Sequence, residues 1–128
     1  MAAISTYLAN KLLDHTLRNV AYTPPTTAYL ALYTSVPGPE DTGTEVSGGG
    51  YARQAVTFGV ASGGQVVSST DVVFPVATAS WGTITHIGVK DASTGGNLLY
   101  YAALSASKTI ASEDQIKFPA GQITFSMA

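Results

Sequence analysis

The stretch Trp81–Leu104, WGTITHIGVKDASTGGNLLYYAAL, decides the fold of this chain. Its first part, Trp81–Lys90, has the composition of a long strand whose side chains alternate between two faces. Asp91–Asn97 has turn chemistry, because Asp and Asn bond to nearby backbone and Gly accepts a positive φ. Leu98–Leu104 then returns as the partner strand. The stretch therefore predicts an antiparallel hairpin.

Six shorter segments around this hairpin also have β-type composition, with turn residues between them. They are Thr27–Tyr33, Tyr51–Phe58, Val66–Val67, Val72–Phe74, Gln115–Phe118 and Gln122–Phe125. Short strands that follow a single helix indicate a mainly β fold, namely an antiparallel β-sandwich or barrel-like domain with one N-terminal amphipathic helix. We expect residues 1–128 to form a single domain, with the helix at 4–22, a β-rich body at 26–126 and a long loop at 34–50.

The N-terminal helix is predicted from its apolar period. Ile4, Leu8 and Leu12 lie one turn apart, and an ion pair between Asp14 and Arg18 is expected on the outer face. The later apolar positions are Leu13, Leu17 and Val20. We expect the stripe to pack on the sheet of the same chain. If it is left uncovered, the helix becomes a candidate contact element.

The composition favours a subunit of an assembly. Charged residues make up 11% of the 128 residues, against roughly 25% in typical soluble proteins. A surface with few solvated charges is less costly to desolvate when another surface binds. The six basic residues are scattered and the net charge is −2, which argues against nucleic-acid and membrane partners. The absence of cysteine excludes disulfides.

The glycine-rich stretch EVSGGGYARQ, residues 45–54, raises the question of a phosphate site. It lacks the lysine of a Walker loop, and β-type residues follow where a dinucleotide loop needs a helix. We therefore expect the glycines to lead a flexible loop into a strand. Arg53 is expected to pair with a carboxylate or a backbone carbonyl rather than with phosphate.

Other catalytic and metal-binding patterns are missing as well. His15 and His86 are too few for a zinc site, and no serine has the setting of a nucleophile elbow. The neighbouring acids Glu40–Asp41 and Glu113–Asp114 lie in predicted turns rather than in a pocket that separates two carboxyl pKa values. The seven tyrosines and Trp81 are explained by strand cores and protein contacts better than by a sugar-binding platform. We predict no catalytic, cofactor-binding or metal-binding residues.

Loops as long as residues 34–50 are usually functional or disordered, so we expect this one to contact a partner. Its prolines limit disorder and its glycines let the backbone adapt on docking. We expect that deletion of Pro37–Ser47 leaves a folded domain that no longer joins its assembly. The candidate contact residues are Pro37, Pro39, Glu45, Gly48, Gly49, Gly50, Tyr51 and Arg53.

Several segments between Tyr7 and Phe125 resemble those of known proteins. The most specific are GTEVSGGGYARQ (43–54) and FPVATASWGTITHIGV (74–89), and YLANKLLDHTLRN (7–19) accompanies them. Together they resemble a family of small tailed-bacteriophage virion proteins, often labelled phage tail fibre protein or hypothetical virion protein. The resemblance implies a non-enzymatic structural protein of the virion, made in the host cytoplasm and needing no cofactor, that binds other virion proteins.

Two placements in the virion fit this resemblance. A compact domain without a heptad helix or repeat for a shaft favours a capsid decoration or cement protein, which would bind the major capsid protein and stabilise the head. The alternative is a tail fibre, neck or baseplate attachment module with a host-receptor or glycan-binding role. In both placements we expect a homo-oligomer, with a trimer as one arrangement.

Overall fold

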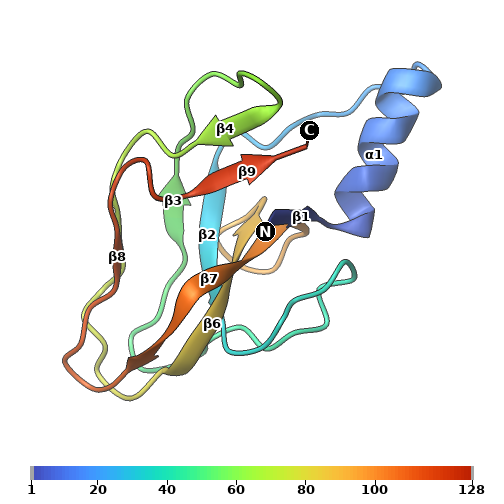
Figure 1. Cartoon of the computed structure of the whole chain (residues 1–128). Coiled ribbons are helices and arrows are strands. Elements are labelled where there is room, and N and C mark those ends of the chain that lie inside the picture. Colours follow the sequence, from blue (N-terminus) through green and yellow to red (C-terminus); the bar gives the residue numbers. More distant parts are fainter. Residues whose placement is uncertain (1, 128) are drawn as a thin grey trace.

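The computed structural model describes residues 2–127 and is mainly β with one helix, which confirms the predicted fold class (Figure 1). The elements follow in the order β1 (Ala2–Ile4), α1 (Thr6–Leu17), β2 (Ala28–Tyr33), β3 (Gln54–Val56), β4 (Gln65–Val67), β5 (Val72–Val73), β6 (Gly82–Lys90), β7 (Leu98–Ile110), β8 (Lys117–Phe118) and β9 (Thr124–Ser126).

The strands form two layers. The larger layer is an antiparallel five-stranded sheet in the order β1-β7-β6-β2-β3. Two short antiparallel pairs, β4–β9 and β5–β8, make the second layer on one side of this sheet (Figure 1). Leu32 and Ile87 of the large sheet belong to one hydrophobic cluster with Phe118 and Phe125 of the second layer. The core therefore lies between the two layers.

The predicted hairpin is the centre of the large sheet. Its turn is closed by the Asp91 carboxylate, whose Oδ1 accepts from the Asn97 backbone N–H at 2.7 Å. The second strand, however, runs to Ile110 rather than ending at Leu104, because its last residues pair again with the start of β6. Between these two paired parts, residues 104–107 of β7 lie opposite Thr85 alone and form a bulge.

The helix is shorter than the predicted range 4–22. Ile4 lies in β1, where it pairs with Tyr100. The helix starts after Ser5, whose Oγ accepts from the Leu8 N–H at 3.1 Å as an N-cap. It ends at Leu17 because Asn19 takes a left-handed conformation with φ 58, which turns the chain out of the helix. The predicted Asp14–Arg18 ion pair is confirmed at 3.1 Å.

The shorter strands also differ from their predicted bounds. Residues 51–53 are not part of the strand predicted for 51–58, because the Tyr51 N–H closes a turn on the Gly48 carbonyl at 3.0 Å. The strands predicted at 72–74, 115–118 and 122–125 are observed as β5, β8 and β9, each two or three residues long. Ladder pairing with a short partner limits each of them.

The loop 34–50 is an ordered part of the fold. Its backbone is fixed to β2, because the Val46 N–H donates to the Leu32 carbonyl at 3.0 Å and the Thr34 N–H donates to the Thr44 carbonyl at 2.9 Å. Neighbouring positions on both faces of β2 are consequently buried, with Leu32 0% and Tyr33 1% exposed. The loop thus packs against the outer face of the sheet, which is the face that points away from the second layer.

A buried ion pair ties this loop to the sheet. Lys90, at the end of β6, is only 5% exposed, and its Nζ lies 2.5 Å from Oδ2 of Asp41 in the loop. The Tyr33 hydroxyl donates to the other oxygen of the same carboxylate at 2.8 Å. Burial, followed by this hydrogen bond, raises the pKa of Tyr33 above its usual value, so that the hydroxyl stays protonated and donates.

Candidate partner-binding surfaces

Three of the predicted contact residues, Glu45, Tyr51 and Arg53, form one hydrogen-bonded group that we call the Arg53 network. Arg53 Nε and Nη2 donate to the two carboxylate oxygens of Glu45, each at 2.8 Å. The Tyr51 hydroxyl donates to Oε2 of Glu45 at 2.7 Å and accepts from the Leu32 N–H at 3.0 Å. The prediction that Arg53 pairs with a carboxylate or a backbone carbonyl is therefore confirmed.

The same guanidinium group also holds the turn of the central hairpin. Nη1 of Arg53 donates to the backbone carbonyls of Ala92 and Gly95, each at 2.8 Å. The Arg53 side chain is 8% exposed and that of Glu45 is 22% exposed, so most of this pair is shielded from water. Arg53 thus joins the loop 45–53 to the hairpin turn, which lies about 40 residues further along the chain.

The electrostatics of the Arg53 network favour the ionised carboxylate. Burial alone would raise the pKa of Glu45, but the hydrogen bonds from Arg53 and Tyr51 outweigh it and hold the pKa below its ordinary value of 4.5. Burial, followed by the hydrogen bond to Glu45, raises the pKa of Tyr51. Glu45 is therefore the acceptor and Tyr51 a protonated donor over the whole neutral range.

A shallow depression, which we call the turn depression, lies above this network. It has a volume of about 340 Å³ and is lined by the loop 45–53 and by the exposed tip of the hairpin turn. The lining residues are Glu45, Val46, Ser47, Gly48, Tyr51, Ala52, Arg53, Ser93, Thr94 and Gly95. Four of the eight predicted contact residues thus meet at one surface, together with a turn that the sequence did not connect to them.

The remaining predicted contact residues serve the fold directly. Gly49 has φ 59, and its carbonyl accepts from Trp81 Nε1 and from the Thr78 N–H, both at 2.9 Å. Gly50 follows it in the same left-handed conformation. Pro37 is fully buried, and the Pro39 carbonyl accepts from the Thr6 N–H at the start of α1. The expectation of a flexible glycine segment is therefore replaced by a fixed one, whereas contact with a partner stays a prediction.

Among residues 2–127, no three His, Cys, Asp or Glu side chains come together as a metal-binding group. Of the acidic neighbours, Asp41 is engaged by Lys90, and Asp114 accepts from the Ala111 N–H at 2.9 Å. Trp81 is 4% exposed and Tyr33 1% exposed, so neither presents a ring face to a sugar. No helix within 2–127 is long and apolar enough to cross a membrane.

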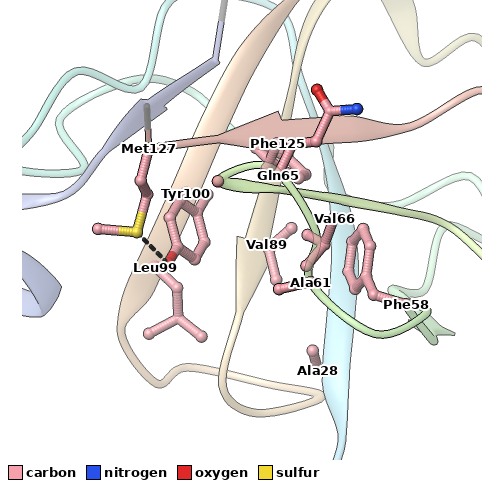
Figure 2. A pocket seen from close by; sticks show the side chains of 11 residues that line it. Ala28, Phe58, Ala61, Gln65, Val66, Val89, Leu99, Tyr100, Phe125 and Met127 are labelled. Carbon is pink, nitrogen blue, oxygen red and sulfur yellow. Dashed lines mark hydrogen bonds between the residues drawn. The ribbon is translucent and has the colours of Figure 1, made fainter.

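A second surface, which we call the apolar groove, lies at the open end between the two layers (Figure 2). It has a volume of about 370 Å³ and is lined by Ala28, Phe58, Ala61, Gly64, Gln65, Val66, Val89, Leu99, Tyr100, Phe125 and Met127. Phe125 contacts both Phe58 and Tyr100, with ring centroids 5.9 and 5.4 Å apart. The groove carries no charged side chain among its lining residues. It was not predictable from the sequence, because five strands, the connection between β3 and β4 and the residue after β9 all contribute to it.

The third surface is the outer part of α1, which projects from the β body (Figure 1). Leu8 is 3% exposed and packs in the core, whereas Leu13 is 55% and Leu17 77% exposed. The expected packing of the helix on its own sheet thus holds for its first turns only. Leu13 and Leu17, which we call the leucine stripe, lie one turn apart on one face of the helix.

Comparison with known protein families assigns this chain to one of them. A family model described as "Podophage GP4 fiber I protein gp80" matches residues 3–126, which is nearly the whole chain. The chain belongs to this family of phage fibre proteins. The predicted resemblance to tailed-phage virion proteins is thereby confirmed, and the chain is a phage structural protein of the fibre or virion class. The search of curated proteins found no match to this chain.

Proposed function

We propose that this chain is a non-enzymatic subunit of a phage tail fibre, and that it works through contacts with other virion proteins. The observation that carries the proposal is the match to a fibre-protein family over residues 3–126. Two apolar features, the leucine stripe and the apolar groove, support it, because uncovered apolar surface of this kind is typical of protein contact sites.

The fibre placement takes precedence over the capsid decoration that the sequence favoured. The reason is the family description, which names a fibre protein. Decoration of the head remains the second candidate, and the feature that favours it is the short helix. With 12 residues, α1 offers little length for the coiled-coil shaft of a fibre. A fibre role therefore requires that the chain caps, joins or stacks on another shaft.

The number of copies in each purified particle separates these placements. We expect a few to a few dozen copies, measured by quantitative mass spectrometry against the major capsid protein of the same particles. Copies in the hundreds, close to the number of capsid subunits, would contradict the fibre placement and support decoration. Gold-labelled antibody on intact particles gives a second readout, with label expected at the tail rather than over the head.

We also propose the turn depression as the contact with a neighbouring virion protein. Its rim is formed by Ser93 and Thr94, which are exposed and uncharged and are therefore easy to desolvate. The double variant Ser93→Arg/Thr94→Arg should stay folded and be incorporated less into particles. Ser107→Arg, exposed on β7 outside the depression, is the matched control. Equal incorporation of both variants would mean that the depression does not contact a neighbouring virion protein.

A further inference from the structure

The leucine stripe and the apolar groove are complementary in chemistry. The groove is lined by aromatic and aliphatic side chains, with Phe58, Val66 and Phe125 along its length (Figure 2). The stripe offers two large aliphatic side chains, Leu13 and Leu17, on one helix face. An amphipathic helix that lays its apolar face in such a groove is a recurring mode of protein recognition.

The size of the groove matches the stripe. A dry apolar cavity of about 150 Å³ holds a molecule as large as benzene, which is similar in size to a leucine side chain. The groove volume of about 370 Å³ therefore accommodates two leucine side chains. Met127, which is 64% exposed, lines the groove and can adjust its flexible side chain to the incoming residues.

The helix does not fill the groove of its own chain. Its first turn is fixed, because the Ser5 N–H donates to the Leu99 carbonyl and the Thr6 N–H to the Pro39 carbonyl, each at 2.9 Å. From the buried Leu8, the axis continues for about 14 Å to Leu17, at about 1.5 Å per residue. Leu17 nevertheless remains 77% exposed, and the groove of the same chain stays open.

The surface area of the chain indicates how large a missing contact would be. The chain exposes 6997 Å², whereas a folded monomer of its 13.2 kDa mass is expected to expose about 6,400 Å². The excess of about 600 Å² approaches the roughly 800 Å² that each partner contributes to a standard interface. One contact that covers α1 on one copy and the groove on the next would bring the exposed area back to the normal range.

We propose that copies of this chain assemble head to tail, with the leucine stripe of one copy seated in the apolar groove of the next. This proposal deepens the fibre role by naming the partner of two surfaces as a second copy. The contact joins two different surfaces, so every copy offers one free helix and one free groove until a ring closes. A closed ring of three copies is one arrangement of this contact, and a trimer is one of the homo-oligomers considered from the sequence.

The test uses one variant of each surface. Leu13→Glu/Leu17→Glu places carboxylates on the stripe, and Ala61→Glu places one in the groove at an exposed position. Wild-type protein at tens of micromolar should be oligomeric, with a mass of two or more times 13.2 kDa by light scattering coupled to gel filtration. Each variant alone should be monomeric, and an equal mixture of the two should form a dimer, because one intact stripe then meets one intact groove.

A matched control and the far-ultraviolet circular dichroism spectrum separate loss of contact from loss of fold. Val36→Glu changes an exposed valine, 55% exposed, outside both surfaces, and should assemble as wild type does. Monomeric wild-type protein at every concentration would overturn the proposal. So would a mixture of two folded, monomeric variants that fails to pair. The copy number per particle is independent of these results, so the fibre placement can fail or hold separately.

Discussion

Arg53 and Glu45 form a bidentate ion pair, and the same guanidinium group binds two backbone carbonyls of the turn after β6. Removal of one partner of a shielded ion pair leaves an uncompensated charge, which typically costs about 3 kcal/mol or more. We therefore expect Arg53→Met to lower the free energy of unfolding by about this amount, measured by urea denaturation.

The control for this substitution is provided by the helix. Arg18 pairs with Asp14 on the surface, where the two side chains are 70% and 42% exposed. Arg18→Met should change the free energy of unfolding by at most about 0.5 kcal/mol, since exposed pairs contribute little. Similar losses of unfolding free energy in the two variants would mean that burial does not make the Arg53–Glu45 pair contribute more than an exposed pair.

The lowered pKa of Glu45 predicts a pH dependence of stability. A carboxyl group whose pKa is lower in the folded chain contributes its full stability above the unfolded pKa, here 4.5, and loses it as the pH falls through the folded value. The difference in unfolding free energy between wild type and Glu45→Gln should therefore be constant near neutral pH and shrink below pH 4.5. Glu40→Gln, at an exposed position, is the control. A difference that does not change with pH would contradict the assignment.

Gly49 is expected to tolerate no side chain. A Cβ there would lie 2.9 Å from Trp81 Nε1, whereas a Cβ at Gly48 would meet nothing within 4 Å. Both residues have a positive φ, so each alanine costs about 1 kcal/mol for the left-handed backbone. Gly49→Ala should cost at least about 1 kcal/mol more because of the close contact. Trp81 is the only tryptophan, so its fluorescence reports the disturbance. Equal costs at both positions would refute the close approach.

Deletion of Pro37–Ser47 should destabilise the chain rather than leave it folded, contrary to the expectation from sequence. The deletion removes Asp41 and Glu45 together, and it leaves Lys90, 5% exposed, without its carboxylate. We expect loss of the cooperative melting transition, followed by circular dichroism. A deletion variant with the wild-type melting temperature would mean that the loop is dispensable for the fold.

Sequence reasoning succeeded where the signals are local. The hairpin turn was predictable because Asp91 and Asn97 lie six residues apart and bond to each other. The extension of β7 to Ile110 was not, because Lys108 and its exposed neighbours gain strand structure only from pairing with β6. The end of the helix at Leu17, set by the left-handed Asn19, was also missed. Pro24 and Pro25, which cannot continue a helix, gave the stronger stop signal in the sequence.

The candidate surfaces divide in the same way. The chemistry of Arg53 made a carboxylate partner predictable, but the choice of Glu45 and of the turn at Ala92 depends on how distant segments pack. The exposure of Leu17 likewise depends on tertiary structure and was not predictable. An apolar helical period is equally consistent with packing on the same chain and with packing on another chain.

The bulge in β7 has a consequence for motion. Residues 104–107 lie opposite a single residue of β6, so most of their amides have no ladder partner there, and Ser105, Ala106 and Ser107 are exposed. Their amide hydrogens should exchange with deuterated solvent far faster than those of Ile87 and Ala102 in the regularly paired part of the hairpin. The longest strand of the sheet would then behave as two short strands joined by a hinge, each opening on its own timescale.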